Sequence, residues 1–152
     1  GKVIIWATYR HNIERIVKAI RKKYESFAVV EAFYGGTKDQ DRTNIIERFK
    51  NPKSDLQYLV ANPKTGGYGL NLVVSDTIIY YSNNYDLEVR VQSEDRIHRM
   101  GQNNKCTYID LQCAGTVDQH IISNLVSKTK ISHKVLNEQY KNWIKELNKS
   151  YK

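Results

Sequence analysis

Two arginines three residues apart, Arg96 and Arg99, are the residues of this chain best suited to chemistry on phosphate. They lie in the segment Gln92 to Gln102, which reads QSEDRIHRMGQ. A guanidinium group stays charged in proteins and grips phosphate oxygens through two N–H groups at once. If residues 87–99 form a helix, both side chains project from nearly one face of its C-terminal end, where cations are favoured. Such a pair could stabilise a transferred phosphoryl group as arginine fingers do. On spacing alone, a solvated helix end with ion pairs to neighbouring carboxylates is the commoner explanation.

A second candidate is the glycine-rich loop Gly66-Gly67-Tyr68-Gly69. Closely spaced glycines let a backbone approach a phosphate and present N–H groups to it. The alternative is a plain turn between a strand and a helix, which could use one glycine but hardly needs three. The loop is not a P-loop, because no Gly-Lys-Ser/Thr follows, and it is not a dinucleotide fingerprint, because the third glycine of that pattern is missing.

Strands and helices must alternate along the chain to position these residues. Apolar runs predict strands at 3–6, 28–33, 56–61, 77–81 and 105–111, and helical periodicity predicts helices between them. Thr37 with Gln40, and Thr116 with Gln119, have the spacing of capping boxes, and Pro52 would end the second helix. Alternation of this kind predicts an α/β fold, in which a parallel sheet has helices on both faces. Ligands of such sheets bind beyond the carboxyl ends of the strands.

The chain is expected to divide into a core, residues 1–115, and a C-terminal helical extension, residues 116–152. One apolar stripe runs along this extension at helical spacing: Leu136, Tyr140, Trp143 and Leu147. We expect the stripe to pack on the core or on a part of the protein beyond this chain.

Composition favours a polyanionic partner. The net charge is +8 and the isoelectric point is about 9.4, and Lys or Arg side chains on phosphates release condensed counterions. Cys106 and Cys113 have no metal-ligand spacing, and the histidines outside the arginine segment are isolated, so no metal site is expected. No apolar run has the length of a membrane span, and no signal peptide is present. The chain enters a strand at once, which suggests a piece of a longer protein, and frequent Lys, Asn, Ile and Tyr suggest an AT-rich bacterial or phage genome.

The arginine segment resembles motif VI of the Swi/Snf family of superfamily-two helicase-like ATPases, which reads Gln-x-x-Asp-Arg-x-His-Arg-x-Gly-Gln. Seven fixed positions match: Gln92, Asp95, Arg96, His98, Arg99, Gly101 and Gln102. The stretch Gly66 to Leu72 resembles motif V, Gly-Gly-x-Gly-x-Asn-Leu. Lys2 to Arg10 resembles motif IV, and Tyr34-Gly35-Gly36 with Arg42 and Phe49 resembles the stretch that follows it. The resemblance covers nearly the whole chain.

This resemblance implies a RecA-like fold and the second of two motor lobes. ATP and Mg²⁺ would be held mainly by an N-terminal RecA-like lobe of the same protein. The present lobe would supply three catalytic residues, Arg96, Arg99 and Gln92. It would also contact the nucleotide through Gly67, Gly69, Asn71 and Asp95. Contacts to the nucleic-acid backbone are expected from Thr8, Arg10, Arg42, Lys64, Thr65, Gly66 and Tyr85. Double-stranded DNA is the implied partner, with RNA as the alternative. The implied protein is an intracellular monomer, in the cytoplasm or nucleoid, or in the host cytoplasm if it comes from a phage.

Two departures from the family pattern bear on these contacts. Pro63-Lys64-Thr65 stands where the family has Thr or Ser, then Arg or Lys, then Ala, and Pro63 removes a backbone donor. Tyr85 replaces a tryptophan, so it could stack on nucleic acid or pack against motif VI. The chain also lacks the Walker A and Walker B elements that hold phosphates and Mg²⁺. The chain alone should therefore not hydrolyse ATP.

Two other functions remain alternatives at this point. The first is a standalone, non-catalytic α/β module that binds nucleic acid. The second is half of a nucleotide-sugar transferase, which also pairs two such lobes, although that class has no double-arginine motif.

Overall fold

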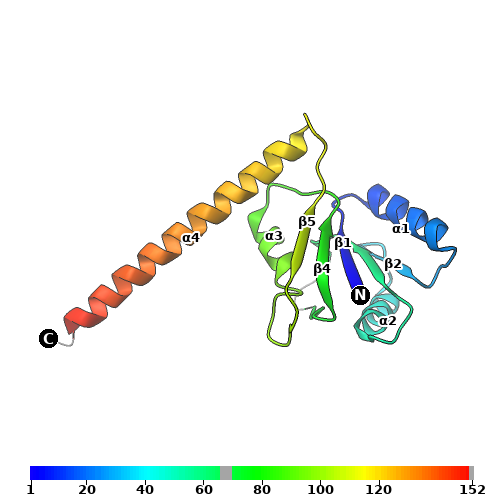
Figure 1. Cartoon of the computed structure of the whole chain (residues 1–152), viewed down its shortest axis with the longest axis horizontal. Coiled ribbons are helices and arrows are strands. Elements are labelled where there is room, and N and C mark those ends of the chain that lie inside the picture. The colour runs from blue at the N-terminus through cyan, green and yellow to red at the C-terminus, as the bar shows by residue number, and fades with distance from the viewer. Residues whose placement is uncertain (66–69, 151–152) are drawn as a thin grey trace.

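Over the residues that the structure describes, the chain forms five strands and four helices, which alternate except that no helix is described between the third and fourth strands. The computed structural model describes residues 1–65 and 70–150, and leaves the side chains of His133 and of residues 135–150 undescribed. In chain order the elements are β1 (Lys2–Trp6), α1 (Arg10–Tyr24), β2 (Val30–Phe33), α2 (Asp39–Lys50), β3 (Tyr58–Ala61), β4 (Ser75–Tyr80), α3 (Leu87–Glu94), β5 (Thr107–Asp110) and α4 (Val117–Ser150) (Figure 1). All five predicted strands are present.

The strands form one parallel sheet in the order β2-β3-β1-β4-β5. In the register of the central strand β1, Ile4 lies opposite Leu59 of β3 and Ile78 of β4. Because all strands run in one direction, the chain leaves every strand at the same edge of the sheet, which we call the carboxyl edge. The expected α/β architecture is therefore confirmed.

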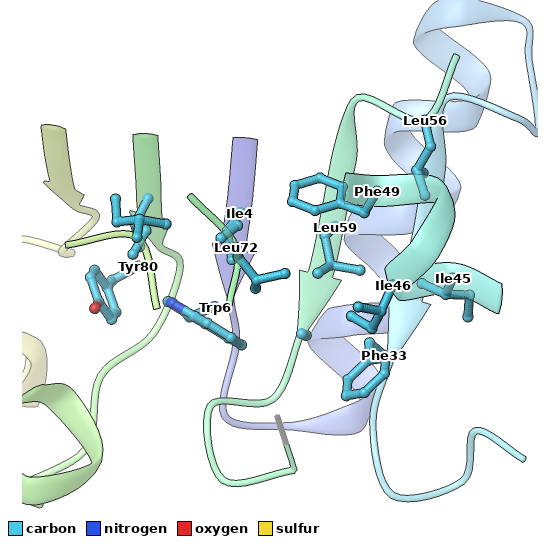
Figure 2. Packing of buried hydrophobic residues seen from close by; sticks show 13 residues of the cluster. Ile4, Trp6, Phe33, Ile45, Ile46, Phe49, Leu56, Leu59, Leu72 and Tyr80 are labelled. Carbon is cyan, nitrogen blue, oxygen red and sulfur yellow. The ribbon is translucent and has the colours of Figure 1, made fainter. Parts of the chain in front are cut away.

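Alternate side chains of each strand enter two separate cores. One core contains Ile4 and Trp6 of β1 and is covered by Ile45, Ile46 and Phe49 of α2. Figure 2 shows these side chains together with Leu72, which belongs to the same core. The other core contains Ile5 and Ala7, and is covered by Ile13 and Val17 of α1. A period of two in the strands thus places α1 and α2 on opposite faces of the sheet.

The α1 face is covered unevenly. Over β2, β3 and β1 the helix α1 buries the sheet, but three large apolar residues at the β4–β5 end remain partly exposed, namely Tyr81 at 39%, Ile109 at 41% and Leu111 at 46%. Helices lie on both faces, as expected, yet Ile109 of β5, which pairs with Ile79 on the α1 face, remains exposed.

The first predicted capping box is wrong. Helix α2 begins at Asp39, so its N-cap is Lys38, whose side chain makes no capping hydrogen bond. The hydroxyl of Thr37 accepts instead from the backbone N–H of Tyr34, at 3.1 Å. The second box is confirmed in part, because Thr116 Oγ1 accepts from Asp118 N and Gln119 Oε1 accepts from the N–H of Gly115 rather than of Thr116.

Helix α4 is attached to the core by its first turns. Ile121 and Leu125 are buried, and Lys128 Nζ donates to the backbone oxygen of Tyr85 at 2.8 Å. Beyond these turns the helix extends away from the sheet (Figure 1). The apolar stripe predicted along it, Leu136, Tyr140, Trp143 and Leu147, lies outside the described side chains.

Candidate nucleotide and nucleic-acid site

The segments that resemble motifs V and VI form one structural unit. The backbone N–H of Leu72 donates to the carbonyl oxygen of Arg96 at 2.9 Å. The side-chain amide of Gln102 donates to Ser75 O at 2.9 Å and to Val73 O at 3.2 Å. Ile97, between the two arginines, is fully buried in the core that contains Trp6. The turn that carries the arginines is therefore fixed by residues more than twenty positions away in the sequence.

Helix α3 ends five residues earlier than expected, and this separates the two arginines. Its last residue is Glu94, with Asp95 as C-cap, and the chain then turns so that Ile97 enters the core. Arg96 is only 7% exposed, whereas Arg99 is exposed. The prediction that both project from one helix face is wrong, because the buried Ile97 side chain and the hydrogen bond from Leu72 impose a turn there.

Arg96 is a buried cation that no carboxylate of the described residues neutralises. Its Nε atom is buried and, within residues 1–65 and 70–134, has no hydrogen-bond partner. Burial lowers the pKa of the Arg96 guanidinium, and the positive charge of Arg99 lowers it further. A guanidinium nevertheless stays charged at neutral pH, and an unpaired buried charge is costly. The site is therefore suited to receive an anion.

The Arg96 side chain lines a small polar hollow of about 280 Å³ near the carboxyl edge. The other lining residues come from the turn after β3 and from the start of α3: Pro63, Lys64, Asp86, Glu88, Val89 and Gln92. Gln92 is exposed, and its amide donates to Glu88 at 2.9 Å. Two candidate site residues, Lys64 and Gln92, are thus brought to Arg96 by the fold.

Arg99 lines a different hollow, of about 590 Å³, which lies beside the first residues of β5. It is shared with His98, Met100 and Lys105, and Met100 is 98% exposed. Gly101 closes the turn with a φ of +99°, a conformation that favours glycine. Arg99 is therefore available to a partner that approaches from outside this chain.

Two further residues predicted at the nucleotide are exposed. Asp95 caps the end of α3, and its backbone N–H donates to Val91 O at 2.9 Å. Asn71 accepts a hydrogen bond from the backbone N–H of Val73 at 3.2 Å. The three predicted glycines, Gly66, Gly67 and Gly69, lie outside the described residues.

The candidate nucleic-acid contacts nearest to the sheet meet at the carboxyl edge. The N–H of Thr8 donates to Ser82 Oγ at 2.9 Å, and its carbonyl accepts from the amide of Asn62 at 2.7 Å. Asn62 also orders the next turn, since its Oδ1 accepts from Lys64 N and its carbonyl accepts from Thr65 N. Three loops after different strands are thereby tied together. Sequence reasoning missed Asn62 and Ser82, although both follow predicted strands directly.

The hydroxyl of Thr8 is itself less available than expected. Its Oγ1 atom is buried and has no hydrogen-bond partner among the described residues. The Lys64 side chain is exposed.

Arg42 and Arg10 have partners within the chain. Arg42 Nε donates to Thr37 O at 2.9 Å, and Nη2 donates to Gly35 O at 3.2 Å, so this side chain supports the turn before α2. It also forms an ion pair with Asp39, at 3.5 Å. Arg10 pairs with Glu14 at 2.7 Å on the surface.

Tyr85, the remaining candidate, is 46% exposed and is held through its backbone by Lys128 of α4. The exposure of Tyr85 is compatible with stacking on nucleic acid, which is one of the two roles expected for it; the other is packing against motif VI.

A charged cluster under α3 was not foreseen. Arg90 lies over the ring of Tyr80 with 3.5 Å between guanidinium carbon and ring centre, and it pairs with both Glu94 and Asp110. Burial lowers the pKa of Arg90, but hydrogen bonds to Asp110 and the other surrounding groups outweigh it, so its pKa is raised overall. The only sequence signal was the helical spacing of Arg90 and Glu94, because Asp110 is distant along the chain.

Metal-binding groups and disulfides are absent from the described residues. No group of three or more His, Cys, Asp or Glu side chains among them could bind a metal ion. Both cysteines are free, Cys106 half-buried and Cys113 exposed. Within the part of the chain that the structure describes, no helix combines the length and apolarity that a membrane crossing requires.

The parallel sheet, together with the joined motif V and motif VI segments, defines a RecA-like α/β domain. The chain belongs to the helicase conserved C-terminal domain family, whose model matches residues 1–101. The resemblance drawn from the motifs is thus confirmed at the level of the family.

Curated relatives include proteins of chromatin remodeling. The chain is 31% identical over 102 residues to the SWI/SNF chromatin-remodeling complex subunit snf22 of Schizosaccharomyces pombe and, over the same length, to the chromatin-remodeling ATPase INO80 of Homo sapiens. Each match covers 67% of this chain and 6% of the relative, so the chain spans a small part of these proteins. Both relatives are eukaryotic and give no support to a bacterial or phage origin.

A solved structure agrees with the fold. The crystal structure of the C-terminal part of the Fun30 ATPase domain superposes with a TM-score of 0.70, over 82% of this chain and 39% of that one, at 22% identity.

Proposed function

We propose that this chain is the second motor lobe of an ATP-dependent translocase on double-stranded DNA. Its membership of the helicase C-terminal family and its similarity to Swi/Snf-type ATPases support a motor lobe. Because the chain spans only 6% of those relatives, the activity of the whole protein is part of the proposal. The lobe would act inside the cell, joined to an N-terminal RecA-like lobe.

The observation that carries the proposal is the state of Arg96. A buried guanidinium without a carboxylate partner among the described residues is costly unless an anion completes the site. Its carbonyl oxygen accepts from the N–H of Leu72, so the backbone that carries the side chain is already in place before an anion arrives. The charge and the donor set fit the oxygens of a nucleoside triphosphate.

In the proposed division of labour, ATP and Mg²⁺ are held mainly by the N-terminal lobe. Bound there, Mg²⁺ would neutralise the phosphate oxygens. Arg96 and Arg99 line different hollows, but their charges are close enough for Arg99 to lower the pKa of Arg96. Both would stabilise charge on the γ-phosphate from the side opposite to that lobe. Gln92, Asp95 and Asn71 would contact the nucleotide or its attacking water, together with Gly67 and Gly69.

Nucleic-acid contacts would lie along the carboxyl edge. Lys64, Thr65 and Gly66 follow β3, and Thr8 follows β1, so one backbone could cross both loops. Arg10 and Tyr85 flank this region, and Arg42 would act there mainly through the turn that it supports. Duplex DNA is the proposed partner.

The test is the DNA-stimulated ATPase activity of the full-length protein that carries the Arg99→Ala substitution. Loss of an arginine finger should lower turnover by roughly 10³-fold or more. Arg99→Lys should recover little, because an ammonium group lacks the planar fork of donors. Since Arg99 is exposed, neither change should unfold the lobe.

Lys105→Ala provides a matched control, because it removes an exposed cation from the same hollow. It should change turnover by no more than a few-fold. Turnover of the Arg99→Ala protein within a few-fold of the unmodified protein would reject the arginine-finger role.

A further inference from the structure

Helix α1 carries most of the excess positive charge of the chain. Its 15 residues contain six Lys or Arg residues and one acidic residue, Glu14, in a chain with a net charge of +8. Helix α2, on the other face of the sheet, contains three acidic and three basic residues. The excess of basic over acidic residues is therefore a feature of α1 that α2 does not share.

Three of these six basic residues and one histidine of α1 form one straight ridge. Counting from the first, they follow the spacing i, i+4, i+7 and i+11, which keeps them on one side of a helix. Ile13 and Val17 point into the core, so this side faces away from the sheet. All four side chains are exposed. We call them the cationic ridge: His11, Arg15, Lys18 and Lys22.

The ridge is not neutralised within the described part of the chain. Of the acidic residues near it, Glu14 pairs with Arg10 at 2.7 Å and Glu31 pairs with Arg48 and Arg21. Glu25 lines the same hollow as Lys18 and Lys22 but forms no ion pair among the described residues. Among the described residues, none of the four ridge side chains forms an ion pair. Like charges at such spacing destabilise a helix slightly, so the arrangement gains nothing for folding.

The length and spacing of the ridge fit a nucleic-acid backbone. Eleven residues of helix rise by about 16 Å, which is roughly half of the 34 Å turn of a duplex. Neighbouring ridge residues have Cβ atoms about 5–6 Å apart, so Arg15, Lys18 and Lys22 could meet successive phosphates. The ridge also begins at His11, directly after Thr8 and Arg10 at the carboxyl edge.

We propose that the cationic ridge is an additional contact for the phosphate backbone of a DNA duplex, separate from the loops that couple DNA to ATP. The inference rests on the proposed motor function and adds to it a surface that raises affinity. Contacts of this kind read no bases, so the ridge would bind all duplex sequences alike. It would not change the rate of ATP hydrolysis once DNA is saturating, because no ridge residue lies at the Arg96 or Arg99 hollow.

The test measures binding of the chain to a 30-base-pair duplex by fluorescence anisotropy at several salt concentrations between about 50 and 200 mM, a range over which backbone contacts lose affinity steeply. The ridge variant is Arg15→Ala, Lys18→Ala and Lys22→Ala together. Each lost phosphate contact lowers the slope of log affinity against log salt by about 0.9, so the slope should fall by about 2 to 3. Affinity at the lowest salt should fall about tenfold or more.

The matched control is Lys38→Ala, Lys50→Ala and Lys53→Ala, which removes the same charge from exposed residues in and around α2. It should leave the slope nearly unchanged. A charge-preserving variant, Arg15→Lys with Lys18→Arg and Lys22→Arg, should bind like the unmodified chain. Thermal unfolding confirms that each variant is folded, and if the triple alanine variant is not, Arg15→Gln and Lys22→Gln tested singly should each lower the slope by about one.

The outcomes separate this inference from the proposed function. Equal losses in the ridge and control variants would show a general charge effect and overturn the inference. An unchanged ridge variant alongside a weakened Lys64→Ala variant would overturn the inference and leave the motor function standing. If neither region matters for duplex binding, the DNA-binding function itself is rejected.

Discussion

At the scale of single residues, Gln102 has a structural role that its place in a phosphate-binding motif conceals. Its amide donates to the carbonyl oxygens of Val73, Ser75 and, more weakly, Ile97, and its Oε1 accepts from Asn104 N. One side chain therefore joins the end of the motif to the residues that lead into β4.

We expect Gln102→Ala to lower the free energy of unfolding by about 1–3 kcal/mol, because it leaves half-buried carbonyl groups without donors. Chemical denaturation of the purified chain measures this. The control is Gln92→Ala, an exposed residue bonded only to Glu88, which should change stability by less than about 0.5 kcal/mol. Equal effects of the two substitutions would contradict the role of Gln102.

Arg42 is a second residue whose partners lie within the chain. Because it donates to the carbonyls of Thr37 and Gly35, Arg42→Ala should destabilise the chain by roughly 1–2 kcal/mol. Differential scanning fluorimetry with and without duplex DNA separates this from a phosphate contact. A variant of unchanged stability and weakened DNA binding would instead make Arg42 a direct contact.

At the scale of elements, α2 begins without a good cap. The N-cap residue Lys38 has extended backbone angles and makes no side-chain hydrogen bond to the helix. Ser is favoured at this position because its hydroxyl accepts from the first free N–H groups. Lys38→Ser should therefore raise the free energy of unfolding by about 1 kcal/mol.

Thermal unfolding of the Lys38→Ser chain tests this, with Lys53→Ser as a control that removes the same charge outside any helix. If the midpoint of thermal unfolding rises equally in both variants, the stabilisation comes from the loss of a positive charge and not from a helix cap.

Arg90 connects α3 to the strands beneath it. It pairs with Asp110 at the end of β5 and lies over Tyr80 of β4, so Arg90→Met would leave a half-buried carboxylate without its partner. We expect a loss of about 3 kcal/mol, measured by denaturant unfolding. Arg10→Met is the contrasting control, because it breaks an exposed pair on α1 and should leave the unfolding midpoint unchanged. Similar midpoints for the two variants would refute the role of Arg90.

At the scale of the whole molecule, the lobe supplies one side of a shared site. We expect the purified chain to hydrolyse no ATP above background, with or without duplex DNA, because the Walker A and B elements are not in its sequence. A malachite-green phosphate assay tests this, with the full-length protein as positive control. Turnover by the chain that Arg99→Ala abolishes would show a complete site in this lobe and reject the division between two lobes.

Local pattern was enough to predict the order of elements. The apolar run Val3 to Trp6 predicted a strand, and Ile13 with Val17 at helical spacing predicted a helix. Both patterns can be recognised without the rest of the chain. Ends of elements were less predictable. Thr37 has the right spacing for a helix cap, but its hydroxyl accepts a hydrogen bond from the backbone N–H of Tyr34 instead of from the first N–H groups of α2. Which of these donors it binds depends on the path of the chain after β2.

For the candidate site too, some features could be predicted from the sequence and others could not. The sequence by itself determined the alternating α/β order and the family, because both depend on residue types at fixed spacing, and it identified Arg96 and Arg99 as the residues for phosphate. Only the tertiary structure decided that Arg96 is buried and Arg99 exposed. Ile97 enters a core built from distant strands, and Leu72 binds the Arg96 carbonyl. Contacts between residues far apart in the chain set this difference, and no local spacing encodes them.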